Sequence, residues 1–393
     1  MHSVLRVQYH FWQLQPAGYH AVNILLQALN AILLWIVLRR LAVPGNWWIA
    51  AIWALHPLQV ESVAWITEIK NLLSAGFYFL AMLAYLSFRA AQAGRGRFVR
   101  PYVLALVFFL LALLSKTTAV TLPAVLLVLL WWKSPRVQRR EVWDLVPFFA
   151  LAAGLGAFTW WLETFHVGSE HVPPLTFWDR LLIPGRVAWF YAGKLLWPVR
   201  LNFIYPRWTV DPAVWWQFLF PLAAAAVVVL LWMRRERWGK GPLSAVLFYL
   251  LTLAPVSGLA RFYFQLYSFV GDHFQYLAGI GLVAAAVAPT ARWVEQRRGT
   301  PSIAAVRRIG PPVLLAALGL LTWNRTQVYR TEEALWRDTL AQNPAAWIAH
   351  NNLGVVCKQQ GRKAEAAEHF QNALKYNPNS PEQLPHTCQP ERA

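Results

Sequence analysis

Ten apolar runs separated by short polar segments constrain this chain more than any other feature of its sequence. A helix that crosses a bilayer needs about 20 mostly apolar residues and satisfies its backbone hydrogen bonds internally. Because 57% of the residues are hydrophobic and 14% are charged, the chain is also too apolar for an ordinary globular domain. The sequence therefore predicts an all-α protein, a polytopic membrane helix bundle of about ten spans. The predicted spans are residues 19–38, 47–65, 72–88, 101–114, 118–132, 145–162, 214–233, 242–260, 268–288 and 310–323.

Basic residues gather in five of the polar segments between these runs. Positively charged loops lie on the cytoplasmic side of membrane proteins, which also accounts for the net charge of +18. The C-terminal region is then non-cytoplasmic, provided that residues 181–199 lie on the outer face or re-enter it without crossing. No nucleic-acid recognition module accompanies the charge, so we expect no nucleic-acid partner. The clusters are Arg39 and Arg40; Arg89, Arg95, Arg97 and Arg100; Lys133, Arg136, Arg139 and Arg140; Arg234, Arg235, Arg237 and Lys240; and Arg292, Arg297, Arg298, Arg307 and Arg308.

Residues 55–74 interrupt the apolar pattern most strongly. An ionisable group near membrane depth costs several kcal/mol unless it faces protein or water, so we expect this stretch to line a cavity at one membrane face. On a helix, Glu61, Trp65 and Glu68 would share one stripe, with the two carboxylates roughly 10 Å apart along the axis. A retaining glycosidase needs about 5 Å between its carboxyl groups, so the pair does not indicate a hydrolase. The interrupting residues are His56, Pro57, Glu61, Glu68 and Lys70.

The C-terminal part is polar and repeats with a period of 34 residues. Asn343-Pro344 recurs as Asn377-Pro378, and Trp336 recurs as Phe370. This period predicts a tetratricopeptide repeat (TPR) of two packed helices, present as one and a half units. We therefore expect three parts: a membrane domain at 1–323, repeats at 324–378 and a disordered tail at 379–393. Leu353, Gly354, Gly361, Ala366, Phe370, Ala373 and Pro378 occupy the packing positions, whereas His350 and Cys357 replace the usual large aromatic residues.

Residues 55–74 resemble the signature loop of the transmembrane and tetratricopeptide-repeat family, which is related to lipid-sugar-dependent O-mannosyltransferases of the GT-C type. Residues 113–127, 186–208, 268–282 and 335–354 resemble other blocks of that family in the same order. For a bacterial member, the resemblance implies a glycosyltransferase of the inner membrane that uses a polyprenyl-phosphate-linked sugar to glycosylate proteins on the non-cytoplasmic face. The repeats would present the protein acceptor. No cofactor is implied beyond the lipid-linked donor, and a requirement for a divalent metal stays open.

Transfer from a polyprenyl phosphate needs cations that hold the phosphate and a carboxylate that takes the proton of the acceptor hydroxyl. Glu61 and Glu68 are the candidates for the base, with Glu163, Glu170 and Asp179 as alternatives in outward loops. The alternative explanation for Lys116, Arg186 and Lys194 is snorkelling toward lipid headgroups, and for Asp272 and His273 a structural pair. The phosphate-binding candidates are Lys116, Arg186, Lys194, Arg261, Asp272 and His273.

Metal and soluble-enzyme motifs are not evident in the sequence. His166 and His171 flank Glu170 at a spacing that is wrong for two ligands on one helix face, which favours a surface loop. Cys357 and Cys388 are too few for a four-ligand metal site, so we expect no metal centre. The alternatives to a glycosyltransferase are a non-catalytic, membrane-anchored TPR interaction protein and a polysaccharide or glycan ligase.

Residues 9–23 resemble the stretch that follows the first span and a large acidic outer loop in this family. No Asp or Glu precedes residue 19. We therefore expect the chain to lack the N-terminal span and the family's paired acidic residues, so that it binds the donor without completing transfer. The alternative is a short amino-terminal tail that is translocated with the first helix.

Overall fold

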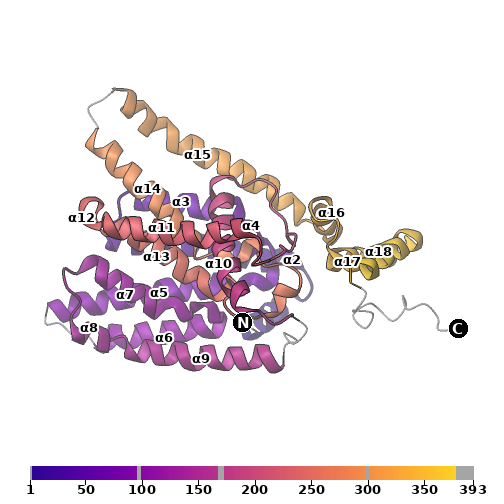
Figure 1. The fold of residues 1–393 in the computed structure, drawn as a ribbon, viewed down its shortest axis with the longest axis horizontal. Helices are drawn as coiled ribbons and strands as arrows, with labels where there is room; N and C mark the ends of the chain where they lie inside the picture. Colours follow the sequence, from indigo (N-terminus) through magenta and orange to yellow (C-terminus); the bar gives the residue numbers. More distant parts are fainter. Residues whose placement is uncertain (1, 95–98, 167–171, 298–300, 378–393) are drawn as a thin grey trace.

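A computed structural model describes residues 2–94, 99–166, 172–297 and 301–377, and these residues form helices and connecting loops without any β-strand (Figure 1). The all-helical fold is therefore confirmed. The α-helices are α1 His2–Trp12, α2 Pro16–Arg40, α3 Asn46–Leu55, α4 Val60–Ala64, α5 Ile69–Ala93, α6 Val99–Ser115, α7 Leu122–Lys133, α8 Arg139–Trp143, α9 Val146–Phe165, α10 Phe177–Leu196, α11 Leu219–Met233, α12 Arg235–Trp238, α13 Gly241–Leu253, α14 Gly279–Gln296, α15 Pro301–Val328, α16 Glu332–Gln342, α17 Trp347–Gln359 and α18 Lys363–Tyr376. Short 3-10 helices join them: η1 Pro57–Gln59, η2 Ile66–Glu68, η3 Thr117–Thr121, η5 Trp215–Phe218, η6 Ala254–Val256, η7 Tyr263–Leu266 and η8 Asp272–Gln275.

Four helical segments of the described chain are long and apolar enough to cross a membrane, judged by length and composition. Further apolar helices are shorter, so the expected count of about ten spans is not confirmed. The helix α11 contains no buried residue although it is strongly apolar, which is typical of a surface that faces lipid. The four candidate segments are Pro16–Arg40, Ile66–Ala93, Arg139–Phe165 and Trp215–Met233.

Two of the predicted spans are broken in the structure. The expected helix over 47–65 ends at Leu55, because Pro57 removes a backbone donor, and it continues only as η1 and α4. The predicted stripe of Glu61, Trp65 and Glu68 is therefore wrong, since Trp65 is extended between α4 and η2. The expected span at 268–288 also differs, because residues 268–278 form a loop with η8 before α14 begins.

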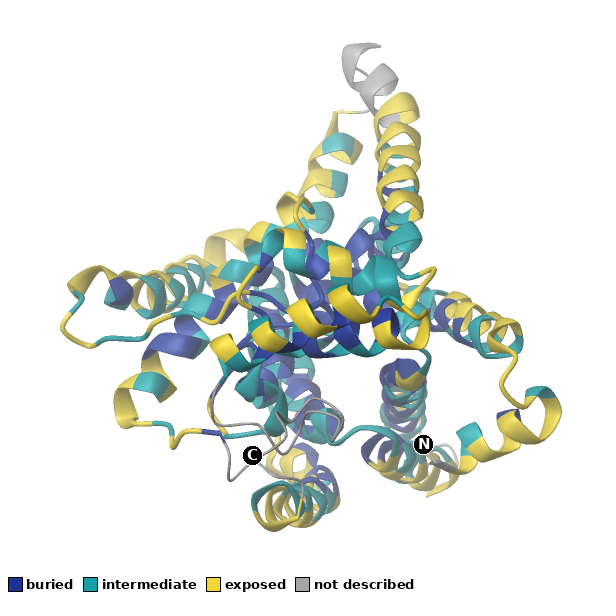
Figure 2. Ribbon diagram, turned by 90° about the vertical axis from the view of Figure 1, so that its right-hand side faces the viewer, coloured by how far each residue is buried: buried dark blue, intermediate teal, exposed yellow. Residues whose placement is uncertain are grey.

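The main core lies between α2, α3, α5, α6, α7, α9 and α14, and the buried residues concentrate in the middle of the bundle (Figure 2). Trp53 of α3 is fully buried there and stacks edge-on against Phe79 of α5, with ring centroids 6.2 Å apart. Its indole nitrogen donates to the backbone oxygen of Tyr276, 2.8 Å away. An aromatic residue with a satisfied polar atom thus joins α3, α5 and the segment that leads into α14.

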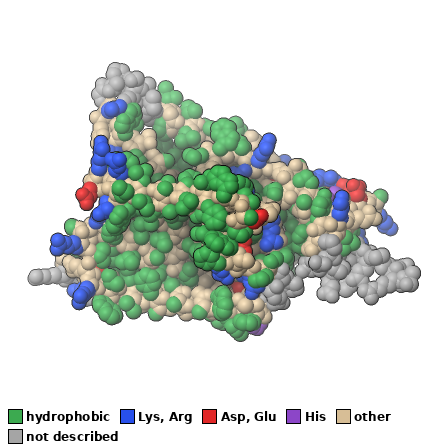
Figure 3. Space-filling model, viewed as in Figure 1, with side chains coloured by type: hydrophobic (Ala, Val, Ile, Leu, Met, Phe, Trp, Pro, Cys, Tyr) green, Lys and Arg blue, Asp and Glu red, His purple; other side chains and the backbone are tan. Residues whose placement is uncertain are grey.

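Basic residues collect at the end of the bundle that carries α12, which we call the basic end (Figure 3). Lys133, at the end of α7, donates to the backbone oxygen of Leu41, just past α2. Lys240 donates to the backbone oxygens of Trp131 and Ser134 at 2.9 and 3.2 Å. The C-terminal ends of α2 and α7 and the start of α13 therefore meet at this end.

The repeats lie at the opposite end of the bundle, which we call the repeat-domain end (Figure 1). The helix α15 runs without interruption through the expected boundary at Trp323, and Thr322 donates to the backbone oxygen of Leu55 at 2.7 Å. In the α17–α18 hairpin, a Cβ added to Gly354 would lie 2.7 Å from the Phe370 ring. This contact explains why a small residue faces a large one. Leu353, Ala366, Phe370 and Ala373 form the hairpin core with Cys357, Gly361 lies in the turn at φ 77°, and Pro378 and the tail at 379–393 lie outside the described residues.

The helix α16 docks on the loop of residues 201–205. Asn343 donates to the backbone oxygen of Ile204 at 3.1 Å, and Gln342 donates to that of Leu201 at 2.9 Å. Phe203 inserts between two aromatic rings, with its centroid 5.5 Å from Trp336 and 5.0 Å from Trp65. Because Trp65 belongs to the interrupted stretch 55–74, this loop joins the repeats to the most polar part of the bundle.

Candidate functional site

The break at Pro57 directs the stretch 56–71 into the interior at the repeat-domain end. His56 caps η1 by accepting from the backbone nitrogen of Leu58 at its Nδ1, 3.2 Å away. Its Nε2 then donates to the backbone oxygen of Leu195 at 3.0 Å, so the ring is held as one neutral tautomer. Burial lowers the pKa of His56 to about 4. This histidine is therefore a fixed structural joint between the stretch and α10.

Glu61 and His273 form a buried carboxylate–imidazole pair, although they are 212 residues apart in the sequence. Their side chains are 1% and 4% exposed. The rings of Trp65 and Phe264 lie edge-on to His273, with centroids 5.6 and 5.4 Å away. One oxygen of Glu61 contacts Nδ1 of His273, and the other, Oε2, has no hydrogen-bond partner among the described residues.

Glu68 lies at the centre of a second set of charges. Its Oε1 is 2.7 Å from the Lys70 ammonium, and its Oε2 is 3.4 Å from that of Lys116. Asn71 donates to Oε2 of Glu68 at 2.6 Å and to the backbone oxygen of His273 at 3.0 Å. Lys116 donates to Oδ1 of Asn71 at 2.7 Å, and burial lowers its pKa. Asn71 therefore connects the Glu68 charges to the Glu61–His273 pair.

Asp272 faces a different side from its neighbour His273. The hydroxyl group of Tyr205 donates to its Oδ1 at 2.8 Å, and both side chains are buried. Burial and the nearby Glu61 carboxylate raise the pKa of Asp272 to about 8, against the opposing effects of Arg325 and Lys194. We call Glu61, Glu68, Asn71, Lys116, Asp272 and His273 the polar cluster.

The structure brings five of the expected site residues into this cluster and leaves the others outside it. Lys194 lies at its edge, over the Tyr205 ring at 5.4 Å, and donates to the backbone oxygens of Val199 and Arg200. Arg186 is remote from these contacts and stacks over Trp208 at 4.4 Å. The five residues brought together are Glu61, Glu68, Lys116, Asp272 and His273.

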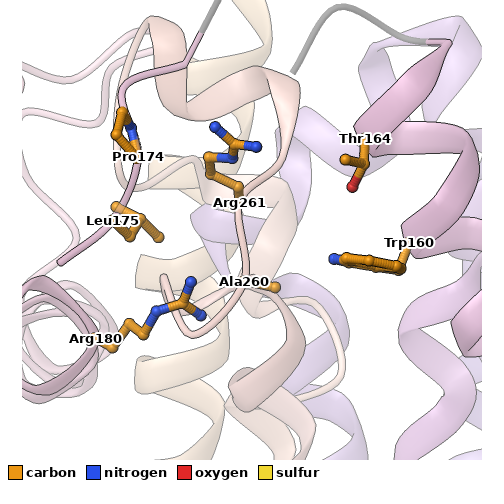
Figure 4. Close-up of a pocket in the computed structure, with 7 residues that line it drawn as sticks. All are labelled: Trp160, Thr164, Pro174, Leu175, Arg180, Ala260 and Arg261. Atoms are coloured by element: carbon orange, nitrogen blue, oxygen red, sulfur yellow. The ribbon is translucent and has the colours of Figure 1, made fainter. Parts of the chain in front are cut away.

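Arg261 lines a separate cavity of about 260 Å³ (Figure 4). Arg180, at the start of α10, lines the same cavity and donates to the backbone oxygen of Leu259 at 2.6 Å. Arg261 donates to that of Val172 at 3.3 Å. The sequence provided no signal for Arg180, because a single arginine beside a helix start is common. The lining residues, which define the arginine cavity, are Trp160, Thr164, Pro174, Leu175, Arg180, Ala260 and Arg261.

The remaining acidic and histidine candidates have other positions. Asp179 completes the N-cap of α10, where its Oδ2 accepts from the backbone nitrogen of Thr176 at 2.8 Å. Glu163 is half-buried on α9, and the His166 ring packs at a tilt against Trp161 with centroids 4.5 Å apart. Glu170 and His171 lie outside the described residues.

A group of potential metal ligands occurs in the repeats, where the sequence indicated none. Cys357, Glu365 and His369 offer a sulfur, an oxygen and a nitrogen atom that all lie within 4.8 Å of one another. Glu365 and His369 are one turn apart on α18, but Cys357 comes from α17. Only the packing of the hairpin reveals the group.

The described chain thus combines helices able to cross a membrane, a buried polar cluster and a helical-repeat hairpin. The Tetratricopeptide repeat family model matches residues 347–380, which confirms the predicted repeat. Protein O-mannosyl-transferase TMTC1 of Homo sapiens is 24% identical over 414 residues, covering 93% of this chain and 46% of the relative. Protein O-mannosyl-transferase Tmtc2 of Drosophila melanogaster is 43% identical over 67 residues, which is 17% of this chain and 7% of the relative.

A third relative, Protein O-mannosyl-transferase Tmtc1 of Drosophila melanogaster, is 35% identical over 121 residues, which is 30% of this chain and 13% of the relative. The matched region spans less than half the length of each of these relatives. No solved structure matches the chain. These similarities confirm the resemblance to O-mannosyltransferases that combine membrane helices with tetratricopeptide repeats.

Proposed function

We propose that this chain is an integral-membrane glycosyltransferase of the bacterial inner membrane that transfers a sugar from a polyprenyl phosphate to a protein. In this proposal the bundle has about ten spans, several of them short, and the repeats face the non-cytoplasmic side. The observation that carries the proposal is the polar cluster, because three carboxyl groups and an imidazole are buried together at the repeat-domain end, next to a lysine whose side chain is 14% exposed. This end lies away from the basic end, which the positive-inside rule assigns to the cytoplasm.

Glu61 is the general base in this proposal, which departs from the expectation that the chain binds the donor without completing transfer. Its Oε2 has no hydrogen-bond partner among the described residues, whereas its other oxygen is oriented by His273. A positioned carboxylate of this kind can accept the proton of an acceptor hydroxyl group as the sugar is transferred. Because Glu61 is only 1% exposed, the substrates must displace part of its surroundings to reach it. Glu68 forms ion pairs with Lys70 and Lys116 and accepts a hydrogen bond from Asn71. It therefore acts as a positioning residue in this proposal, through the bond from Asn71 to the backbone of His273.

The arginine cavity holds the phosphate in this proposal. Guanidinium groups are suited to phosphate because their N–H donors match two oxygen atoms at once, and they stabilise the charge that develops on the leaving group. The cavity and the polar cluster belong to the same end of the bundle, since Thr117, next to Lys116, shares a hydrogen bond of 2.8 Å with Thr159, next to Trp160. Exposed aromatic residues on α9, including Trp160 and Phe158, offer an apolar surface for the polyprenyl chain.

Sugar transfer by the full chain in lipid nanodiscs tests the proposal. A radiolabelled polyprenyl-phosphate mannose and an acceptor peptide are supplied, and label in the peptide is counted. We expect turnover that falls by about 10²-fold or more in Glu61→Gln and by a smaller factor in Arg261→Gln. Glu236→Gln, at an exposed position of the basic end, is the matched control and should retain full activity. Turnover that survives Glu61→Gln would place the base elsewhere.

A non-catalytic, membrane-anchored interaction protein is the second candidate function. The observation that favours it is that Glu68, Lys116 and Asn71 satisfy one another inside the protein, as a structural network would. Binding of the lipid donor separates the two functions. A glycosyltransferase, or a related glycan ligase, binds polyprenyl-phosphate sugar in an Arg261-dependent way, whereas an interaction protein does not.

A further inference from the structure

Three potential metal ligands converge in the α17–α18 hairpin, away from the polar cluster. Cys357 is a buried, free cysteine, and Glu365 and His369 are partly exposed beside it. Their ligand atoms all lie within 4.8 Å of one another. Because two of the three side chains reach the surface, an ion can enter the site from solvent.

The hydrogen bonds of His350 and His369 determine which ring nitrogen of His369 carries the lone pair. The Pro344 carbonyl oxygen can only accept, so His350 donates to it from Nε2 at 3.0 Å. A neutral His350 then accepts at Nδ1, which lies 3.1 Å from Nδ1 of His369. His369 must donate from that nitrogen, and its lone pair is left on Nε2. This lone pair faces Oε1 of Glu365 at 3.9 Å, a separation too long for a hydrogen bond.

The same arrangement provides the support that proteins give to a metal-binding histidine. A ligating imidazole commonly donates its second N–H to a fixed acceptor, which orients the ring and sets its tautomer. His369 does this through His350, which is itself held by the Pro344 carbonyl and stacks on Tyr376 with centroids 5.8 Å apart.

We propose that Cys357, Glu365 and His369 bind a zinc ion or a similar divalent cation. Thiolate, imidazole and carboxylate are the ligands that zinc uses, and two of them around one tetrahedral ion lie roughly 3.4 to 3.6 Å apart. A shift of about 1 Å therefore closes the site, and water fills the fourth position. The thiol of Cys357 releases its proton to solvent when its sulfur binds the ion.

The charged neighbours of the site balance one another. Arg337 and Arg362 pair with Glu333 and Glu365, so these four groups carry no net charge, and the site gains a negative charge when the Cys357 thiol loses its proton on binding the ion. Arg337 contacts the same Oε1 of Glu365 that faces His369, and the ion would share or replace this contact. The bound ion would join α17 to α18 at the hairpin whose usual large aromatic residues are replaced by His350 and Cys357. This inference does not depend on the proposed glycosyltransferase activity.

Cobalt binding by the full chain in detergent tests the site. Cys388→Ser is introduced first, so that Cys357 is the only thiol. We expect one equivalent of Co²⁺ to produce a thiolate-to-cobalt charge-transfer band in the near ultraviolet, and Zn²⁺ to displace it. Zn²⁺ should also stabilise the α17–α18 hairpin against unfolding. Slower hydrogen exchange of the hairpin amides measures this stabilisation.

Variants assign the ligands. Cys357→Ala should abolish the band, His369→Gln should weaken binding by at least tenfold, and His350→Gln should weaken it by about 10- to 100-fold through the lost orientation of His369. His10→Gln, at an exposed histidine of α1, is the matched control and should bind as the parent does. His369→Gln keeps the test valid if Cys357→Ala does not fold. The absence of a charge-transfer band at millimolar Co²⁺, or unchanged binding in His369→Gln, would overturn the proposal.

Discussion

Tyr205 donates a hydrogen bond of 2.8 Å to the buried carboxyl group of Asp272, and this bond joins two structural units. Tyr205 ends the loop on which α16 docks through Asn343 and Gln342. Asp272 precedes His273, which pairs with Glu61. A continuous series of contacts therefore leads from the first repeat helix to the polar cluster.

Tyr205→Phe removes the hydroxyl group and leaves the Asp272 carboxyl group without this donor. Because an unsatisfied buried polar group is costly, we expect a loss of about 1 to 3 kcal/mol in the free energy of unfolding. Thermal unfolding followed by tryptophan fluorescence measures the change. Tyr19→Phe removes an exposed hydrogen bond to Gln13 and should have a much smaller effect. Equal effects of the two variants would contradict a special role for the Asp272 contact.

The stability of the folded chain should depend on pH through Asp272. Its carboxyl group ionises near pH 4 in an unfolded chain and near pH 8 in the folded protein. Between these values the folded state holds one more proton, so this group's contribution to stability falls as the pH rises from about 4 to about 8. Asp272→Asn cannot ionise and should remove this component. The difference in unfolding temperature between the parent and Asp272→Asn should therefore change from pH 5 to pH 8.5, and parallel curves would argue against a protonated Asp272.

Lys116→Met tests the charge network around Glu68. The change leaves a buried carboxylate with Lys70 as its remaining cation, so we expect a loss of roughly 2 to 4 kcal/mol in stability. Adding Glu68→Gln should restore part of that loss, and the double-mutant cycle should give a coupling energy of about 1 kcal/mol or more. Lys240→Met, which removes an ammonium that donates to two backbone oxygens at the basic end, is the control and should not couple to Glu68.

Gly354→Ala tests the packing of the repeat hairpin. The new Cβ would lie 2.7 Å from the Phe370 ring, so the helices must separate, and we expect a loss of about 1 to 3 kcal/mol. Hydrogen exchange should show faster exchange in α17 and α18 and little change in the bundle. Gly319→Ala, in α15 with nothing near its added Cβ, is the matched control and should be neutral or slightly stabilising. Fast exchange in both variants would indicate a non-specific effect.

Sequence patterns predicted elements that depend on local signals. The apolar run at 19–38 became α2, and the 34-residue period located the repeat that the family model also matches. The polar cluster depended on long-range contacts, since Glu61 and His273 lie 212 residues apart. The predicted stripe of Glu61, Trp65 and Glu68 was wrong because it assumed one continuous helix. The helix is interrupted at Pro57 and again at the extended residue Trp65.

Under the proposed function, the docking of α16 on residues 201–205 affects how a bound polypeptide reaches the polar cluster. A repeat module on a flexible linker samples many positions, and the effective concentration of its cargo at a distant site falls as the linker lengthens. Here α15 enters the repeats as one unbroken helix, and Phe203 is wedged between Trp336 and Trp65. The repeats are thus held at a fixed position relative to the polar cluster. Under the proposed function they would select among the hydroxyl groups of a bound polypeptide, according to the distance of each hydroxyl group from the segment that the repeats bind.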